Sequence, residues 1–487
     1  MIPLKDDDER PAVDIAPEEF RRLGYRAIDL LTEHFAALAD RPCRAPVPGN
    51  VRRELMERSI PMEGADPDAL LDEVAATILA YPMGNNSGRF FGWVNSSVAP
   101  LCTLAELLAA GLNPSVAGGD HAATYVEHAV LGWMRQIVGL PAAGGGILTS
   151  GGSVANLIGL AVMRHVKTEG RVRALGMGGA QPPLIVYASS EGHSCIQKGI
   201  ELLGIGHANL RRIPCTADWR MDVEVLAAQI AEDRAAGLMP ACVAATAGTV
   251  NTGAIDPLDR LAALCRAEQL WFHVDAAYGG PAALVPELAD LYRGLDQADS
   301  VAVDPHKWMY VPVECGCALV KDRQAMRDAF SLVPPYLRDD SALPWFSEFG
   351  IQQSRGFKAL KLWIVLRQIG VSGYRQLISH DIALARALQR RLREAGDFDL
   401  VSAGPLSITC FRYRPAAASL PDAILDRLNR NILDAVQTAG EVFLTGTELQ
   451  GRFVLRACIV NFRTRESDLD ALLEAIRRVQ FGLRAAL

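Results

Sequence analysis

The sequence has no excess of basic residues, no long apolar run and no basic-plus-apolar leader. Its 56 acidic side chains outnumber the 49 basic ones and the net charge is −7, which gives no electrostatic case for nucleic-acid binding. No uninterrupted apolar stretch is long enough to cross a bilayer. Residues Met1–Glu19 are acidic and polar, unlike a signal peptide. We therefore expect a cytoplasmic protein with neither a nucleic-acid nor a membrane partner.

Clustered cysteines and histidines are also lacking. The ten cysteines are scattered, with Cys315 and Cys317 the one close pair. That pair and the pair His121/His128 do not combine into a set with metal-ligand spacing. Without a secretory signal, the cysteines are better interpreted as reduced, mostly buried thiols than as disulfides. We expect no metal site.

The sequence does contain strand-like and helix-like patterns in alternation. Hydrophobic residues make up 50% of the chain and charged residues 22%, a globular composition, and 487 residues predict two or three packed units. Residues 17–40, 69–79, 100–112 and 122–138 have helical character. Strands alternating with helices then favour an α/β fold with a mostly parallel sheet. The strand-like runs are Gly146–Thr149, Leu184–Ala188, Cys242–Ala245, Leu270–Val274, Ser300–Val303 and Cys317–Val320, and the helical stretches are Val154–Val166, Cys195–Leu203, Val223–Ala236 and Pro257–Glu268.

After Tyr374 the pattern predicts a smaller α/β unit. Thr464, followed by Glu466 and Asp468, predicts the N-cap and acidic first turn of a last helix. The other elements expected here are helices over 378–395 and 422–439 and strands at Phe398–Val401, Ile408–Tyr413, Glu441–Thr445 and Arg452–Ile459.

Lys307 is the first candidate for chemistry. It follows the apolar run Ser300–Val303, and Pro305 turns the chain just before it. Desolvation among apolar neighbours favours the neutral amine, which attacks carbonyl groups as a Schiff base with pyridoxal phosphate (PLP) requires. A lysine at a loop tip is more often an ordinary surface residue. Whether Lys307 is functional therefore depends on the other motifs.

The segment Thr149–Ser153 joins a strand to a helix and contains two glycines. Glycines and a helix N-terminus bring backbone N–H groups close to an anion. The segment matches neither nucleotide-binding glycine motif, and a single phosphate is the right size of ligand. A plain tight turn is an equally good interpretation of this segment alone.

Asp275 ends the strand-like run that begins at Leu270. A buried carboxylate must be paired or become protonated, and a pyridinium nitrogen is a suitable partner. Ala276 and Ala277 leave room for a flat ring beside it. The alternative is a simple strand-end cap.

Two further polar clusters follow strands. His193 could stack on an aromatic cofactor or donate a proton, although a lone histidine is more often structural. Thr246 and Thr249 close another strand with hydroxyl groups. Four clusters beyond the carboxyl ends of strands match the usual place of a site in an α/β sheet.

Together these segments resemble the PLP-dependent group II decarboxylases, the family of aromatic-L-amino-acid, histidine and glutamate decarboxylases. The resemblance covers Glu18 to Arg478, with the order and spacing of the motifs preserved. The matching segments are Thr149–Asn156, His193-Ser194, Thr246–Thr249, His273–Gly280, Asp304–Trp308 and Ser354–Trp363.

The resemblance implies an aspartate-aminotransferase-like fold (PLP fold type I). It divides the chain into an N-terminal helical segment (1–90), a large PLP-binding domain with a seven-stranded sheet (91–374) and a small C-terminal α/β domain (375–487). It also implies an obligate homodimer whose active sites lie at the subunit interface, and decarboxylation of an L-amino acid, most simply an aromatic one, to the amine and carbon dioxide.

The resemblance also assigns roles to residues. Lys307 bonds covalently to PLP and Asp275 pairs with its ring nitrogen. The other implied PLP contacts are His193 on the ring face, Thr246 and Ala277 beside the ring, and Gly152, Ser153 and His306 at the phosphate. Asp304 is a weaker phosphate candidate, because aromatic decarboxylases more often have Asn there.

On the substrate side the resemblance points to Phe91, Trp93 and Asn95. Where mammalian aromatic decarboxylases tend to have Phe-Pro-Thr, this chain has Val94-Asn95-Ser96, a departure that also admits a smaller, polar or acidic substrate. Tyr336 matches a catalytic loop tyrosine that reaches the neighbouring subunit. Arg355 matches an arginine that is either structural or substrate-positioning.

Three alternatives remain open at this point. An oxygen-using relative that forms an aldehyde would be expected to lack Tyr336. A desulfurase or transaminase of the same fold would lack the His-Lys-Trp context, and a desulfurase would need a loop cysteine that residues 320–345 do not contain. A non-catalytic interaction protein would be expected to lose Lys307 or Asp275.

Overall fold

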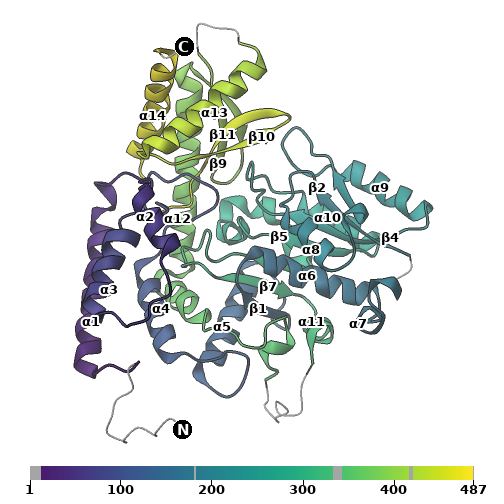
Figure 1. The fold of residues 1–487 in the computed structure, drawn as a ribbon. Helices are drawn as coiled ribbons and strands as arrows, with labels where there is room; N and C mark the ends of the chain where they lie inside the picture. Colours follow the sequence, from purple (N-terminus) through teal and green to yellow (C-terminus); the bar gives the residue numbers. More distant parts are fainter. Residues whose placement is uncertain (1–12, 180–181, 333–342, 416–419, 486–487) are drawn as a thin grey trace, which may run out of the picture.

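The apolar runs in the middle of the chain form one sheet in the computed structural model, which describes residues 13–179, 182–332, 343–415 and 420–485. Seven strands lie in the order β1-β7-β6-β5-β4-β2-β3 (Figure 1). β2 to β6 run parallel, and β7 is antiparallel to both of its neighbours. This confirms the predicted α/β fold with a mostly parallel sheet. The strands are β1 (Gly145–Thr149), β2 (Leu184–Ser189), β3 (Leu210–Ile213), β4 (Met239–Thr246), β5 (Trp271–Asp275), β6 (Ser300–Val303) and β7 (Gly316–Val320).

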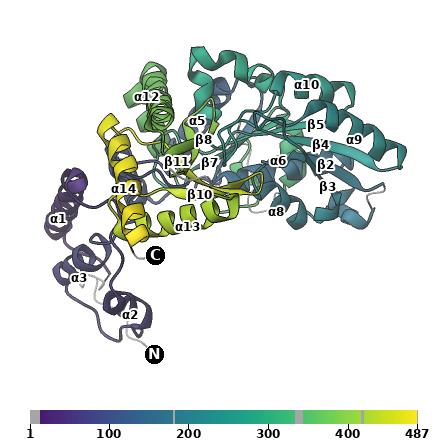
Figure 2. The ribbon, with the colours of Figure 1, turned by 90° about the horizontal axis from the view of Figure 1, so that it is seen from above.

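Helices cover both faces of this sheet (Figure 2). One face carries α5 (Ala122–Ile137), α9 (Val223–Ala235) and α10 (Leu258–Ala267), and the other carries α6 (Gly152–Lys167), α8 (Cys195–Leu202) and α11 (Arg323–Phe330). The short α7 (Val172–Leu175) follows α6. Because both faces are covered, most strands read as continuous apolar runs instead of alternating ones.

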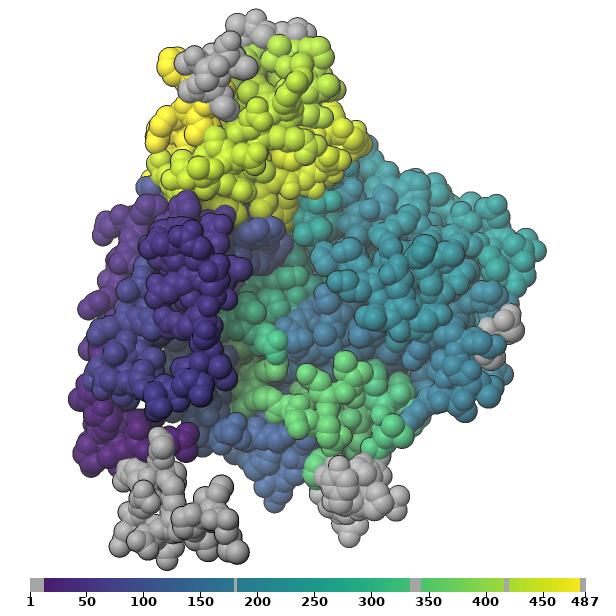
Figure 3. Space-filling model, in the orientation of Figure 1, coloured from purple at the N-terminus to yellow at the C-terminus, as the bar shows by residue number. Residues whose placement is uncertain are grey.

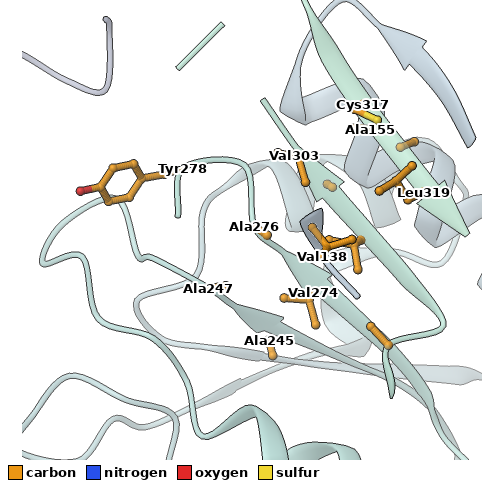
Figure 4. Close-up of a cluster of buried hydrophobic side chains, with 14 of the residues drawn as sticks. Val138, Ala155, Ala245, Ala247, Val274, Ala276, Tyr278, Val303, Cys317 and Leu319 are labelled. Atoms are coloured by element: carbon orange, nitrogen blue, oxygen red, sulfur yellow. The ribbon is translucent and has the colours of Figure 1, made fainter. Parts of the chain in front are cut away.

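A single apolar cluster fills the interior of the large sheet. Val274 of β5 lies in it beside Ala245 of β4 and Val303 of β6 (Figure 4). Because side chains alternate along a strand, Trp271, His273 and Asp275 point to the opposite face of β5 from Val274. This alternation gives β5 one apolar face and one face that carries polar groups.

A smaller unit follows along the chain. It contains an antiparallel sheet in the order β10-β11-β9-β8, formed by β8 (Phe398–Ala403), β9 (Ile408–Tyr413), β10 (Thr445–Leu449) and β11 (Arg452–Cys458). α13 (Asp422–Ala439) and α14 (Glu466–Ala485) pack with it, and α12 (Ala359–Ala395) runs from the large unit to β8. α12 has a non-helical backbone at Gly370. The predicted boundary at 374/375 therefore lies within a helix, and the three-part division stays a prediction.

Three local predictions were wrong. Strand β3 was missed, because Arg211 and Arg212 interrupt its apolar pattern at the sheet edge. The strand expected over 441–445 begins only at Thr445, since Phe443 instead bridges to Phe90. Thr464 does not cap α14, because its hydroxyl donates to the Gly88 carbonyl while Asp468 accepts from the Arg465 N–H.

The N-terminal helices lie along one side of the molecule (Figure 3). α1 (Pro17–Ala36), α2 (Gly49–Glu57) and α3 (Pro67–Glu73) contain no buried residue, and α3 continues as a π-helical turn over Val74–Ile78. Arg22 and Arg26 of α1 form ion pairs with Asp68 of α3. α4 (Pro100–Leu112) follows and packs on α12. Among the described residues, no helix has the length and apolar character needed to span a membrane.

Candidate active site

A cavity of about 570 Å³ opens where the parallel strands end. Its walls come from the segments just beyond β1, β2, β4, β5 and β6 and from residues 93–95. This is the edge of the sheet at which the sequence predicted the four polar clusters to meet. A volume of this size suits a small organic ligand.

Lys307 lies in the cavity one turn beyond β6, with its side chain 24% exposed. Its Nζ is 3.1 Å from Oδ2 of Asp304, which is 2% exposed. Burial favours the neutral amine, but the carboxylates of Asp304 and Asp275 outweigh burial and raise the pKa of Lys307 above its usual value. The expectation of a neutral lysine is therefore wrong for the chain by itself, because a carboxylate that stands three residues earlier pairs with the amine.

Asp275 faces the same cavity from the end of β5 and is 6% exposed. Its Oδ1 accepts a hydrogen bond from the Ala277 N–H at 3.1 Å. Its Oδ2 accepts from the Cys195 thiol, with 3.8 Å between sulfur and oxygen. These two bonds use only part of the acceptor capacity of a carboxylate. Asp275 can therefore accept a further hydrogen bond from a group in the cavity.

The start of α6 forms a cradle for an anion. Gly152 and Ser153 begin this helix and line the cavity, and the first N–H groups of an α-helix have no partner within it. A Cβ at Gly152 would lie 2.6 Å from Oδ2 of Asp304, so only glycine fits.

His306 closes the other side of the cradle. Its Nδ1 accepts from the Cys315 N–H at 3.1 Å, and burial lowers the pKa of His306. In the neutral ring the proton therefore sits on Nε2, 3.7 Å from Oδ2 of Asp304. The helix start, the space kept by Gly152 and this donor fit a phosphate group. The carboxylate of Asp304 is the one group here that a phosphate would repel.

A family model, the pyridoxal-dependent decarboxylase conserved domain, matches residues 48–414. This match covers well over half of the chain and includes every residue that lines the cavity. The chain belongs to the pyridoxal-dependent decarboxylase family. It is a PLP-dependent amino-acid decarboxylase, and PLP is the group that fits the cradle, the lysine and the carboxylate described above.

Several relatives of the decarboxylase are similar along nearly their whole length. An aromatic-L-amino-acid decarboxylase of Bacillus atrophaeus is 32% identical over 96% of each chain. A phenylacetaldehyde synthase of Petunia hybrida is 30% identical over 95% of this chain and 94% of its own. Among solved structures, Oryza sativa TDC with PLP and tryptamine superposes with a TM-score of 0.89 at 27% identity, covering 96% of this chain and 99% of its own.

The structure brings most of the other predicted site residues to the cavity. His193, Thr246 and Ala277 line it. His193 Nδ1 accepts from the Cys195 N–H at 3.2 Å, and burial lowers the pKa of His193, so its proton lies on Nε2. Thr246 is held at the end of β4 because its N–H donates to Asp256 at 2.8 Å.

The substrate side is only partly as predicted. Trp93 and Asn95 line the cavity. Phe91 does not: it is fully buried in the apolar core of the small unit, and its N–H donates to the Phe443 carbonyl. The expectation for Phe91 is corrected on this point, since β-type pairing with residue 443 turns its side chain away from the site.

Two further predicted residues have different outcomes. Tyr336 lies outside the described residues. Arg355 is buried and holds the fold together: it forms an ion pair with Glu127 and donates to the carbonyls of Val116 and Leu148. Of the two roles left open for Arg355, these contacts support the structural one.

Three residues of the cavity wall lie outside every segment that the sequence marked as part of the site, namely Cys195, Val250 and Glu314. The Cys195 thiol contacts Asp275, and Asn156 contacts Cys195 in turn. Asn156 belonged to a matched motif, which was a usable signal. Glu314, which pairs with Lys358 at 3.0 Å, follows no strand and belongs to no motif, so nothing in the sequence marked it.

Proposed function

We propose that the decarboxylase removes the α-carboxyl group of an aromatic L-amino acid as carbon dioxide and releases the amine. The observation that carries this proposal is the pair Lys307 and Asp275, which face one cavity from the ends of two adjacent parallel strands. A reactive amine and a carboxylate placed in this way match the two ends of a pyridoxal ring system. When bound, PLP supplies a conjugated ring that accepts the electrons left on Cα as carbon dioxide departs.

We assign the two groups complementary tasks. Lys307 would hold PLP, because its amine is the group in the cavity that can bond to a carbonyl carbon. Asp304 stabilises the protonated form of Lys307 before PLP is bound, because Nζ and Oδ2 are 3.1 Å apart and the carboxylate raises the pKa of the amine. Asp275 holds a proton on the ring nitrogen of PLP through its free acceptor capacity.

The remaining residues orient the bound groups. Gly152, Ser153 and His306 donate to the phosphate, as the helix start and the Nε2 proton of His306 support. Thr246 and Ala277 flank the ring. His193, which lines the cavity, would lie against the ring face, and its Nε2 proton would make it a second candidate for returning a proton to Cα. Which bond at Cα breaks depends on the orientation that these residues impose.

The substrate assignment rests on the apolar residues that line the cavity and on the relatives. Trp93, Val94 and Val250 give an apolar and aromatic wall, which suits an aromatic side chain. Two of the relatives compared above have an aromatic amino acid or its product in their names. Asn95 on the same wall keeps a smaller polar or acidic amino acid as the alternative.

An assay against all twenty amino acids tests the substrate. The purified protein is supplied with PLP, and carbon dioxide and amine are measured for each substrate, with Lys307→Ala as the inactive control. We expect equal amounts of carbon dioxide and amine from an aromatic L-amino acid. Turnover confined to small polar or acidic amino acids would replace the aromatic assignment by the alternative.

The aldehyde-forming reaction is the second candidate, favoured by the similarity to the Petunia hybrida synthase. Tyr336 decides between the two, since a phenol can return a proton to Cα and a phenylalanine cannot. We expect Tyr336→Phe to lower amine formation and raise aldehyde, ammonia and peroxide in air. If the variant forms amine at the wild-type rate without aldehyde, the proton comes from another group, with His193 the next candidate.

We further propose a homodimer with active sites at the interface. The support is α4, whose leucines at helical spacing are exposed, among them Leu104 (42%), Leu108 (59%) and Leu112 (69%); an apolar face of this kind marks an interaction site. Leu108→Glu should convert the protein to monomers in light scattering. Mixing inactive Lys307→Ala and Tyr336→Phe chains should restore part of the amine formation, which a monomeric enzyme could not show.

The location in the cell is also a proposal. All ten cysteines are free and nine of them are buried, which is the usual state in a reducing compartment. We infer a cytoplasmic enzyme, which fractionation of the source cells tests.

A further inference from the structure

Five buried polar side chains that have no part in the function proposed above form a row that ends at Asp275. Trp271, His273 and Asp275 share one face of β5, and the row is completed by Ser300 of β6, Asn156 of α6 and Cys195 of α8. Each of the six is at most 7% exposed. Gly159 of α6 makes room for the imidazole, since a Cβ there would lie 2.8 Å from Nδ1 of His273.

Hydrogen bonds connect these six side chains without a break. Trp271 Nε1 is 2.8 Å from Ser300 Oγ, and Ser300 Oγ is 2.8 Å from His273 Nδ1. His273 Nε2 is 2.7 Å from Asn156 Oδ1, and Asn156 Nδ2 is 3.5 Å from Cys195 Sγ. The Cys195 thiol makes the last contact, with Oδ2 of Asp275.

The direction of each hydrogen bond follows from two groups with a fixed role: the Trp271 N–H can only donate and the Gly152 carbonyl can only accept. An indole N–H can only donate, so the Ser300 hydroxyl accepts from Trp271 and gives its own proton to His273 Nδ1. Asn156 Nδ2 also contacts the Gly152 carbonyl at 2.8 Å, which can only accept. The Asn156 oxygen therefore faces His273, whose proton must sit on Nε2.

Electrostatics agrees with this assignment at both ionisable links. Burial lowers the pKa of His273 to about 4, so the ring is neutral and carries one proton. Burial, with the neighbouring Asp275, raises the pKa of the Cys195 thiol, so its S–H remains a donor. Every bond of the row therefore points towards Asp275.

We propose that this donor chain is a positioning device for Asp275: it holds the carboxylate charged and turned to the cavity, so that it can pair with the ring nitrogen of PLP. A buried carboxylate needs donors to stay ionised, and each bond in a chain polarises the next. The proposal rests on the proposed role of Asp275. A substitution at Cys195, next to the carboxylate, should therefore weaken PLP binding more than a substitution at Ser300, at the far end of the chain.

Three variants of the full-length protein test the chain. PLP is removed, and the dissociation constant of PLP and the visible spectrum of the bound form are measured for Cys195→Ala, Cys195→Ser and Ser300→Ala. We expect about fivefold weaker binding and a changed absorption band in Cys195→Ala, because one bond to a charged group is lost. Cys195→Ser should restore both the PLP affinity and the absorption band. Ser300→Ala should change both in the same direction, with PLP binding about twofold weaker.

Nitrogen-15 NMR of His273 in the cofactor-free wild type gives an independent readout. We expect a neutral ring protonated on Nε2, and a proton on Nδ1 or on both nitrogens would overturn the chain even if no variant folds. Wild-type binding and spectrum in Cys195→Ala would also overturn it. If the wild type itself binds no PLP, the proposed function fails, and this outcome is distinct from the failure of the chain alone.

Discussion

The ends of β5 and β6 place two buried carboxylates in one cavity, and the two are satisfied in opposite ways. Asp275 after β5 accepts from a backbone N–H and a thiol. Asp304 after β6 pairs with the ammonium of Lys307, and its Oδ1 has no hydrogen-bond partner among the described residues. Asp275 can therefore pair with a cationic group of a ligand, whereas Asp304 is already paired with the ammonium of Lys307.

The supports behind the two strand ends also differ. Asp275 is backed by the neutral donor chain. The segment after Lys307 is backed by Asp381 of α12, which accepts from Trp308 Nε1 and the Tyr310 hydroxyl at 2.8 Å each. The Trp308 ring in turn stacks on Tyr278, with 5.1 Å between ring centroids. The first support therefore bonds a carboxylate that faces the cavity, whereas the second bonds Asp381, a carboxylate outside the cavity wall whose pKa burial raises to about 7.

Asp275→Asn should have the largest effect, because it removes the carboxylate that faces the cavity from the end of β5. We expect turnover to fall on the order of 100-fold or more, with some PLP retained, since an amide cannot hold a proton on the ring nitrogen. Turnover and PLP content are measured together. Near-wild-type turnover would show that Asp275 is not needed for the reaction and that the two strand ends do not differ in function.

Gly152→Ala should come next, because the added Cβ would lie 2.6 Å from Asp304 Oδ2 and 3.1 Å from the Ala277 Cβ. We expect PLP affinity to fall about tenfold or more through the lost fit of the phosphate, while the fold is kept. The matched control is Gly178→Ala, where a Cβ meets nothing within 4 Å. Equal affinities in the two variants would place the phosphate elsewhere.

Asp304→Asn should change Lys307 and leave Asp275 unaffected. The Asp304 carboxylate helps to raise the pKa of Lys307, so the pKa falls when the carboxylate is removed. One unit of pKa is a tenfold change in neutral amine, and we expect Lys307 of the cofactor-free variant to be acetylated about tenfold faster at pH 8. Mass spectrometry measures the rate, with Asp290→Asn on the surface as control. An unchanged rate would mean that Asp304 does not set the charge of Lys307.

Asp381→Asn should have the smallest effect, on stability alone. Burial raises the pKa of Asp381 to about 7 from its usual 3.8. The folded state therefore binds this proton more tightly than the unfolded chain, and the contribution of Asp381 to stability falls as the pH rises from about 4 to about 7. Asn keeps an acceptor for Trp308 and Tyr310 and does not ionise.

We therefore expect Asp381→Asn to unfold about 2–5 °C higher than the wild type at pH 8 and to show no such gain at pH 4. Thermal unfolding followed across this range measures the difference. Asp434→Asn on the exposed face of α13 is the control. A gain that does not depend on pH would assign the effect to packing instead of to the buried charge.

Local pattern explains how much of the fold was predictable. Helices α4 and α13 begin and end where their apolar spacing and prolines indicated, because helix formation responds to neighbours three and four residues away. Strand β3 escaped because two arginines replace the apolar signal at an exposed edge. Phe91 and Trp93 are both aromatic residues of one segment, and only the pairing of this segment with the distant residue 443 decided that Phe91 is a core residue while Trp93 lines the cavity.

The sequence by itself determined where the chemistry lies. Lys307, Asp275, His193 and Thr246 each follow an apolar strand-like run, and parallel strands bring such positions to one edge whatever else the chain does. The tertiary structure alone decided the charges there. The charge of Lys307 depends on its distance from Asp304. In the donor chain to Asp275, one hydrogen bond joins His273 to Asn156, which lie 117 positions apart in the sequence. Periodicity is a property of neighbours in sequence, whereas a pKa and the direction of a hydrogen bond are properties of neighbours in space.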